Sequence, residues 1–450
     1  MYTSPYFLLT TALSLFPGSS AWSIHQNANA TDGGVNGTSG TNGTSGTNST
    51  GPAVPPPSPS PPTSNGPPVF TISANNITAS FIAYGARLTS LLVPDRNGNM
   101  QDIIVGYDDP QRYIEDTNTN HTFFGAIAGR YANRIKNGTF QLDGVTYDIT
   151  KNELDATQTL HGGAVGYDQR NWTVASLTPN SITFKLNDTG FEGFPGDVIN
   201  YATFSVSSSY GTGDPNPAAS MAARTVSIAT TKRTPIMITP HIYWNLNAFK
   251  QPNVLQDTSL QLPLSTRYIE VDSRLIPTGA IGSVSASPDG TLDFTQPKLI
   301  GQNIQSAVGI CGADCTGYDT CFIIDRPGNK SDWTSSPEMM VEAVKMSSTT
   351  TGINMTVSTN QRAVQIYSCN SQNGTIPVKR SQVEKNQQAG GDGTVVQNIE
   401  KYGCVVVETE GWIDGINNPQ WGQEPFQVFS PETAPAVNWA KYVFTTNGQS

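Results

Sequence analysis

The stretch that decides the fold is Cys404-Val405-Val406-Val407-Glu408-Thr409-Glu410-Gly411-Trp412, near the end of the chain. Its run of β-branched residues predicts a buried strand, because such residues pack well on a pleated surface. We expect this strand to deliver a carboxylate at its end, with the ring of Trp412 beside it. A carboxylate next to an aromatic ring suits proton transfer on a sugar, since the ring can stack on the sugar face. Taken alone, the stretch fits ordinary charges at a strand end equally well.

The rest of the chain has the composition of a strand-rich protein. Of 450 residues only 13% are charged, while 42 are Gly and 31 are Pro, which favours short strands and turns over long helices. Alternating segments at 139–142 and 145–149 flank Asp143-Gly144, a strong hairpin signal. No long apolar stripe of helical period and no repeat is present. We therefore predict an all-β fold, one large antiparallel β-sandwich over residues 69–450.

Other segments fit this interpretation. Two turn-rich segments, 208–220 and 371–400, are predicted to be surface insertions. Alternating apolar and polar residues predict further strands at Ile182–Leu186, Ala202–Val206, Thr225–Ala229, Ile236–Thr239 and Ala363–Tyr367.

The N-terminal segment has the features of a targeting sequence followed by a tether. Residues 1–21 contain a short apolar core and then small residues, which predicts a signal peptide, although no Lys or Arg precedes the core. A buried N-terminal strand is the alternative. Residues 22–68 are repeats of Asn, Gly, Thr and Ser followed by a Pro-rich run, which predicts a flexible tether. We expect the protein to be secreted.

Potential N-glycosylation sequences support export. Their density is typical of a secreted eukaryotic glycoprotein. The motif Asn-x-Ser/Thr begins at Asn29, Asn36, Asn42, Asn48, Asn76, Asn120, Asn137, Asn171, Asn187, Asn329, Asn354 and Asn373.

The net charge of −10 limits the classes of partner. Nucleic acids and anionic membranes both require a basic surface, so we expect neither as a partner. No segment is long and apolar enough to span a bilayer. We expect a monomer whose partner is a small molecule.

The five cysteines are an odd number, so one thiol is left over. Cys311 and Cys315 can close a small disulfide, and Cys369 and Cys404 can join two strands, but the spacing does not fix the pairing. No Cys-x-x-Cys is present and none of the four His falls in a ligand-type pair, so we predict no metal site.

Polar motifs supply candidate sugar-binding residues. In Gly129-Arg130-Tyr131-Ala132-Asn133-Arg134-Ile135, the Asn133 amide and the Arg134 guanidinium are donors that suit sugar hydroxyls. Arg130, next to Gly129, is expected to pair with a structural carboxylate instead. Asp319, in Gly317-Tyr318-Asp319, is by spacing alone an ordinary turn residue.

Two histidines have unusual surroundings. His161 precedes two glycines, which predicts a tight turn that leaves its ring uncovered, and His241 lies among aromatic residues in Pro240-His241-Ile242-Tyr243-Trp244-Asn245-Leu246. A lone His is more often structural than catalytic. Imidazole nevertheless gains and loses a proton near neutral pH, so both are candidates for proton transfer.

In this order, the motifs resemble those of the aldose 1-epimerase family, the galactose mutarotases, and suggest a secreted eukaryotic, fungal member. The resemblance covers nearly all of 69–446. It implies a galactose mutarotase-like supersandwich with an open sugar cleft, and interconversion of the α and β anomers of free aldohexoses such as galactose or glucose without a cofactor. It rests on the segments 129–135, 160–168, 240–246, 268–279, 292–294, 317–319, 365–370 and 407–410.

The resemblance also implies roles. Glu408 would be the general base, His241 the acid that protonates the ring oxygen, and His161 an assistant to it. The reaction must deprotonate the anomeric hydroxyl and protonate the ring oxygen, so a base and an acid on opposite sides of the sugar suffice. Burial would raise the pKa of Glu408 and make it a better base. The residues expected to hold the sugar hydroxyls are Asn133, Arg134, Asp319 and Gln365.

Three positions depart from the family pattern. Pro240 replaces the usual Asn and removes a backbone donor beside His241, and Trp244 replaces Phe. Glu410 replaces Gln and lies on the same strand face as Glu408, so it can perturb Glu408 or replace it.

Other functions remain open at this point. One is a sugar-binding module without turnover, suggested by the altered neighbours of His241 and Glu408. Another is a polysaccharide-active enzyme of related fold, suggested by the tether. A sugar-phosphate epimerase is disfavoured, because Arg134 is the chief basic residue near the motifs.

Overall fold

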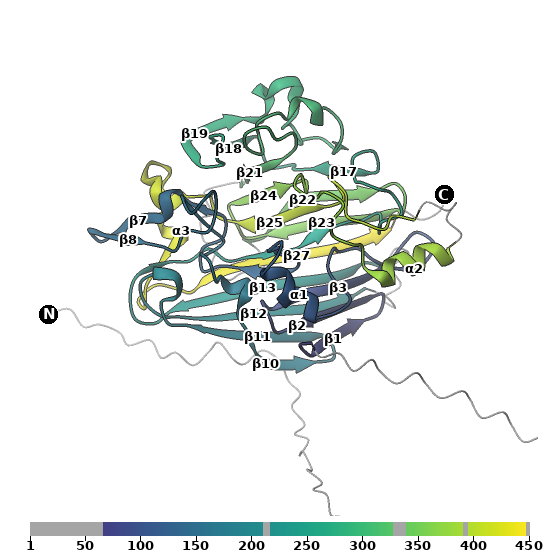
Figure 1. The fold of residues 1–450 in the computed structure, drawn as a ribbon, viewed down its shortest axis with the longest axis horizontal. Helices are drawn as coiled ribbons and strands as arrows, with labels where there is room; N and C mark the ends of the chain where they lie inside the picture. The colour runs from purple at the N-terminus through teal and green to yellow at the C-terminus, as the bar shows by residue number, and fades with distance from the viewer. Residues whose placement is uncertain (1–65, 210–216, 327–338, 390–394, 447–450) are drawn as a thin grey trace, which may run out of the picture. The chain divides into compact units, whose positions relative to one another are not determined.

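The computed structural model describes residues 66–209, 217–326, 339–389 and 395–446. Strands dominate these residues, and the paired strands run antiparallel, which confirms the predicted all-β class (Figure 1). The predicted signal peptide lies outside the described residues, as does the predicted tether apart from residues 66–68. Among the described residues, no helix is long and apolar enough to cross a membrane.

The largest sheet has nine antiparallel strands (Figure 1). The C-terminal strand β27 lies in its middle, between β13 and β23. In spatial order the strands are β10 (Thr173–Thr178), β11 (Ser181–Asp188), β12 (Val198–Ser208), β13 (Ala219–Ala229), β27 (Ala436–Thr446), β23 (Ile353–Thr359), β22 (Val341–Ser348), β17 (Thr258–Gln261) and β20 (Lys298–Leu299).

A six-stranded sheet carries the strand predicted from the valine run. That strand, β25, is an interior strand paired on both sides. In spatial order the strands are β16 (Tyr243–Trp244), β25 (Val405–Glu410), β24 (Ala363–Tyr367), β21 (Asp319–Ile323), β18 (Arg267–Val271) and β19 (Pro277–Ser283).

Smaller sheets and three helices complete the described fold. The hairpin predicted around Asp143-Gly144 is confirmed as β7 and β8. The first sheet contains β1 (Val69–Ala74), β2 (Ile77–Ile82), β3 (Arg87–Pro94) and β4 (Met100–Asp102). The two-stranded pairs are β5 (Ala126–Ala128) with β15 (Thr239–His241), β6 (Arg134–Ile135) with β9 (Thr159–Leu160), β7 (Thr139–Leu142) with β8 (Val145–Asp148), and β14 (Thr234–Pro235) with β26 (Val428–Phe429). The helices are α1 (Gln111–Thr117), α2 (Arg380–Gln388) and α3 (Glu424–Gln427).

Strand β25 is buried on both faces, which explains its run of valines. Val405 and Val407 belong to the main apolar core, whereas Val406 belongs to a second apolar cluster on the other face. Because side chains alternate along a strand, Glu408 and Glu410 share the face of Val406. The apolar core therefore fixes which way the two carboxylates point.

One expectation about the elements was wrong, and another missed a helix. Segment 236–239 does not form one strand. The N–H groups of Ile236 and Met237 donate to the carbonyl oxygens of Gln427, at the end of α3, and Arg130, and the flanking Pro235 and Pro240 have no N–H to donate. Segment 371–400, predicted to be a turn-rich surface insertion, contains a helix that was not predicted, α2, whose residues Gln382, Val383 and Asn386 are buried.

Both of the disulfides considered from the sequence are formed. Cys311 pairs with Cys315, and Cys369 pairs with Cys404. Cys321 is the free cysteine and is buried.

Candidate active site

A cavity of about 630 Å³ opens beside strand β25. It lies on the polar face of the six-stranded sheet, where strand pairing brings together residues from distant parts of the chain. Six of the seven predicted site residues line it: Asn133, Arg134, His161, His241, Asp319 and Glu408. Gln365, the seventh, lies behind them.

Glu408 and His241 form the centre of the site. Glu408 lies in the middle of β25, not at its end as predicted, because the strand continues to Glu410. His241 ends β15, and its Nε2 lies 3.4 Å from Oε1 of Glu408. The expected arrangement on opposite sides of a sugar is therefore wrong. The two side chains lie next to each other, where they can reach two oxygens bonded to the same carbon.

Burial keeps this pair from carrying two charges. It lowers the pKa of His241 to about 3. Burial, helped by the charges of Glu410 and Asp319, raises the pKa of Glu408 well above its usual value, against the opposing effect of Arg134. The predicted direction for Glu408 is confirmed. Both shifts disfavour the charged forms, so the pair favours one shared proton over two charges, an arrangement that suits coupled acid–base catalysis.

Glu410 lies directly behind Glu408 and is fully buried. Its Oε1 accepts a hydrogen bond of 2.8 Å from Nδ2 of Asn133. Burial raises the pKa of Glu410 to about 8, although the Asn133 hydrogen bond lowers it. Glu410 is not among the described residues that line the cavity, and when it is ionised its charge raises the pKa of Glu408.

His161 is held by a turn that only glycine permits at the next position. A Cβ on Gly162, at φ +92°, would lie 2.2 Å from the carbonyl oxygen of Gly129. The prediction that little covers the His161 ring was wrong, because Phe123 and His241 pack on it with ring centroids 4.6 and 4.9 Å away. Burial, with the nearby charges of His241 and Arg134, lowers the pKa of His161 well below its usual value.

The hydrogen bonding of His161 also fixes its tautomer. The backbone N–H of Asn133 donates to Nδ1 at 3.1 Å. Nδ1 must therefore lack a proton, and in the neutral ring Nε2 carries it. His161 can donate a hydrogen bond to a sugar oxygen through Nε2.

The same tautomer bears on metal binding. One ligand atom each from His161, His241 and Glu408 lies within 4.8 Å of the others, a spacing that a metal ion could use. A metal requires an unprotonated nitrogen, but the free nitrogen of His161 carries the proton. The arrangement suits proton transfer better than metal coordination.

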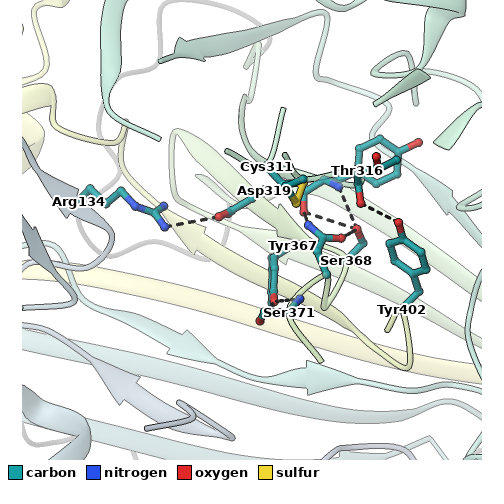
Figure 2. The surroundings of a disulfide bond; sticks show 11 residues. Arg134, Cys311, Thr316, Asp319, Tyr367, Ser368, Ser371 and Tyr402 are labelled. Carbon is teal, nitrogen blue, oxygen red and sulfur yellow. Dashed lines mark hydrogen bonds and ion pairs between the residues drawn. A yellow bond between two sulfur atoms is a disulfide. The ribbon is translucent and has the colours of Figure 1, made fainter. Parts of the chain in front are cut away.

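A second group of charges surrounds Arg134. Its guanidinium binds Glu153 at 2.8 Å and lies 3.6 Å from Asp319. Figure 2 shows Arg134 and Asp319 pointing toward one another, with the Cys311 disulfide nearby. Nε2 of Gln365 donates to Asp319 at 2.5 Å, so Gln365 positions that carboxylate from behind. Glu153 was not predicted, because its pairing with Arg134 is a long-range contact.

The aromatic residues at the site do not include the one predicted from the sequence. Trp412 packs on Trp421 in a separate apolar cluster and does not line the cavity. Phe123, Tyr243 and Tyr367 line it instead, and Phe123 contacts the rings of His121, His161 and His241. No motif marked Phe123, although its neighbour His121 was one of only four histidines.

Arg130 has the structural role that we expected. It is buried, and its guanidinium pairs with Asp188 at 2.6 Å. Among the described residues that line the cavity, Arg134 is the single Lys or Arg, and it already contacts two carboxylates. The cavity therefore lacks the free basic cluster that a phosphate would need.

This chain is similar in sequence and in fold to known proteins. A family model described as aldose 1-epimerase matches residues 68–427. The chain belongs to the aldose 1-epimerase family. This confirms the predicted family and its enzyme class, an isomerase that interconverts the anomers of aldoses.

Relatives of this aldose 1-epimerase family member include fungal and animal proteins. The chain is 66% identical to "Probable aldose 1-epimerase" of Arthroderma benhamiae over 98% of each chain. It is 27% identical to human galactose mutarotase, covering 83% of this chain and 93% of the human protein.

Solved structures share the fold. An aldose epimerase homologue from C. elegans has a TM-score of 0.64 at 23% identity, over 85% of this chain and 100% of that one. Galactose 1-epimerase from Lactobacillus acidophilus has a TM-score of 0.58 at 20% identity, over 84% and 94%. The predicted mutarotase-like sandwich is therefore confirmed.

Proposed function

We propose that this protein interconverts the α and β anomers of free aldohexoses of the galactose and glucose type, using Glu408 and His241 as its proton-transfer pair. The observation that carries the proposal is the 3.4 Å separation of Nε2 of His241 and Oε1 of Glu408 in a buried cavity wall. The anomeric hydroxyl and the ring oxygen are bonded to the same carbon. Two adjacent groups that share one proton can therefore serve both oxygens.

The reaction proceeds by ring opening and closure. Glu408 accepts the proton of the anomeric hydroxyl while His241 donates a proton to the ring oxygen, which breaks the bond between C1 and that oxygen. Rotation about C1–C2 turns the aldehyde, and the reverse proton transfers close the ring as the other anomer. A sugar hydroxyl that donates a hydrogen bond to Glu408 favours the ionised form of Glu408. Sugar binding therefore helps to move the shared proton from Glu408 to His241.

Other residues hold the sugar in this proposal. Nε2–H of His161 donates to the ring oxygen or a neighbouring hydroxyl, and Arg134 and Asp319 bind hydroxyls. The side chain of Asn133 is already bonded to Glu410, so its contribution is to orient Glu410 and His161. Gln365 positions Asp319.

Polarimetry of α-D-glucose and α-D-galactose tests this function. The wild-type protein should reach the equilibrium rotation faster than buffer does. We expect Glu408→Gln to lower the rate by about 10²–10⁴-fold, the usual contribution of a general base. Glu432→Gln is the matched control, because it makes the same substitution at an exposed carboxylate that does not line the cavity. This variant should keep full activity.

The result would also separate the enzyme from a sugar-binding module. Calorimetric sugar binding by a wild-type protein that mutarotates no faster than buffer would favour the module and refute the proposal. Release of new reducing ends from a polysaccharide would favour a polymer-active enzyme.

We propose further that the mature protein is a secreted, glycosylated monomer. Support comes from the apolar core within residues 1–21, the tether-like composition of 22–68 and the many Asn-x-Ser/Thr sequences. The net charge of −10 argues against nucleic acid and membrane partners. Residues 69–450 would then be the catalytic domain. Mass spectrometry and light scattering of the protein in the culture medium would test export and oligomeric state.

A further inference from the structure

Two of the glycosylation sequences lie at the mouth of the active-site cavity. Asn120 and Asn373 both line it, and both are exposed. Asn120 follows helix α1, whereas Asn373 lies in the segment between β24 and α2. The other described asparagines of this motif do not line the cavity: Asn76, Asn137, Asn171, Asn187 and Asn354.

The amide of Asn373 is free to be modified. Its Oδ1 accepts hydrogen bonds from the hydroxyl of Thr375 at 2.6 Å and from the Thr375 backbone N–H at 3.2 Å. Its Nδ2 has no hydrogen-bond partner among the described residues. Asn373 and Thr375, the two residues that define the sequence motif, thus form one exposed turn with the reactive nitrogen directed away from their mutual contact.

Asn120 has an exposed side chain and a buried motif partner. The hydroxyl of Thr122 donates to Asp116 at 2.6 Å, which anchors the segment. No described residue makes a hydrogen bond to the Asn120 side chain. A group attached to Asn120 would therefore displace no described hydrogen bond of that side chain.

The cavity is larger than one hexose requires. Its volume of about 630 Å³ falls in the range of about 300–1,000 Å³ typical of pockets for larger, drug-sized ligands. The bare cavity therefore has room for a sugar that carries a further unit. A bulky glycan at the rim would reduce that room from the outside.

We propose that Asn120 and Asn373 carry N-linked glycans, and that these glycans narrow the cavity mouth so that the exported enzyme selects small free sugars over the reducing ends of oligosaccharides. An oligosaccharide passes from a lipid diphosphate donor to Nδ2 of each asparagine. A bond from sugar C1 to nitrogen replaces its bond to the donor phosphate, the amide loses a proton, and the lipid diphosphate leaves. The proposal rests on the proposed export and deepens the proposed function.

The test compares the full chain secreted by a yeast host with the same chain produced in bacteria, which attach no such glycan. Peptide mass spectrometry before and after glycosidase treatment reads the occupancy of each asparagine. Thr375→Ala should abolish the glycan on Asn373, whereas Thr375→Ser keeps the motif and should keep the glycan. Asn120→Gln removes the other motif, and Asn187→Gln is the matched control outside the cavity.

Polarimetry then measures selectivity between α-D-glucose and maltohexaose. We expect the yeast protein to act on glucose like the bacterial protein, but to be several-fold slower on maltohexaose. Combining Asn120→Gln with Thr375→Ala should restore that activity, and Asn187→Gln should not.

Two results would overturn the inference. One is an exported protein that carries glycans elsewhere but none on Asn120 or Asn373. The other is a protein glycosylated at both positions with unchanged selectivity. Failure of the proposed function is distinguishable, because neither preparation would then mutarotate glucose, while mass spectrometry would still decide whether the two asparagines are modified.

Discussion

The proton-transfer pair depends on two further buried residues: Asn133, which lines the cavity, and Glu410, which is not among the described residues that line it. Glu410 raises the pKa of Glu408 through its charge, and Asn133 binds both Glu410 and His161. The asparagine therefore connects Glu410, whose charge acts on the base Glu408, to the imidazole of His161. Through these contacts, buried residues around the pair influence the acid–base properties of the site.

Replacing Glu410 by Gln should shift the pH dependence of mutarotation. The negative charge of Glu410 raises the pKa of Glu408, and Glu408 must lose its proton to act as the base. Because the pKa of Glu410 is about 8, it carries this charge near and above that pH. Removal of the charge lowers the pKa of Glu408 there, so the acidic limb of kcat/KM should move to lower pH while the maximal rate stays close to wild type. Polarimetry of α-D-glucose between pH 4 and 9 measures this.

The comparison with Glu408→Gln makes the Glu410 prediction decisive. If Glu410→Gln were as inactive as Glu408→Gln at every pH, Glu410 would itself be the base. An unmoved acidic limb would show that the two carboxylates are not coupled.

Individual site residues were predictable where a motif marked them. Six of the seven predicted residues meet at one cavity, because their motifs occur in the order that the fold requires. Phe123 and Glu153 were missed, and Trp412 was assigned to the wrong surface. These positions depend on contacts between distant segments, which local patterns do not encode.

At the scale of the elements, Arg130 links the segment that precedes β6 to the end of β11 and to the loop that follows it. It pairs with Asp188 and donates to the carbonyl oxygens of Pro195 and Gly196. Arg130→Ala leaves the Asp188 charge buried without its partner. We expect the free energy of unfolding to fall by about 3–5 kcal/mol, measured by chemical denaturation.

Arg233 provides the control for this prediction. It pairs with Asp143 and Glu424, but all three side chains are at least one-third exposed. Arg233→Ala should cost no more than about 1 kcal/mol, because solvent screens exposed ion pairs. Equal losses from the two substitutions would contradict the structural role of Arg130.

The two disulfides should differ in their contribution to stability. Cys369–Cys404 closes 35 residues and joins the end of β24 to the start of β25, whereas Cys311–Cys315 closes only 4. A longer loop loses more entropy in the unfolded chain when it is closed. Cys369→Ala/Cys404→Ala should therefore lower the free energy of unfolding by about 2–4 kcal/mol, and Cys311→Ala/Cys315→Ala by less. The opposite order in guanidinium denaturation would contradict this.

Elements were predictable where periodicity and turn residues agreed. The hairpin at 139–148 combines both signals, and strand β25 has an unbroken run of β-branched residues that ends near Gly411. Helix α2 was not predicted, because its buried residues are mostly polar and give no apolar stripe. The segment 236–239 has strand-like side chains, but the prolines that flank it, Pro235 and Pro240, interrupt continuous pairing.

For the whole molecule, the buried acids predict that stability falls as pH rises from about 6.5 to 8. Burial raises the pKa of Glu410 to about 8 and of Asp414 to about 7, and it raises the pKa of Glu408. In the unfolded chain these groups titrate near pH 4. Between the pKa values of these groups in the unfolded chain and their pKa values in the folded protein, the folded state binds more protons than the unfolded state. Rising pH therefore favours unfolding.

The histidines set the lower limit of this pH range. The pKa of both His161 and His241 is lowered in the folded state, so below about pH 6.5 the unfolded chain binds protons that the folded chain does not. Below pH 6.5, proton uptake by these histidines in the unfolded chain opposes the effect of the buried carboxylates on stability. Above pH 6.5 the histidines are neutral in both states and have no such effect. Chemical denaturation from pH 6.5 to 8 should show a decline of up to about 1.4 kcal/mol per pH unit for each proton released.

A double variant identifies the source of this decline. Glu408→Gln with Glu410→Gln removes two of the titrating groups and should flatten the profile. A wild-type profile that is flat or rises with pH over this range would contradict the prediction.

Strand β25 is hydrogen-bonded to a neighbour on each side, and this has a consequence for the working enzyme. A base anchored in this way is in place before the sugar arrives, and the atoms that swing during a catalytic cycle belong to the opened substrate. We expect cross-linked crystals suspended in glucose solution to turn over at the rate of the dissolved protein, and thickening the solvent with an inert polymer to leave the chemical step unchanged.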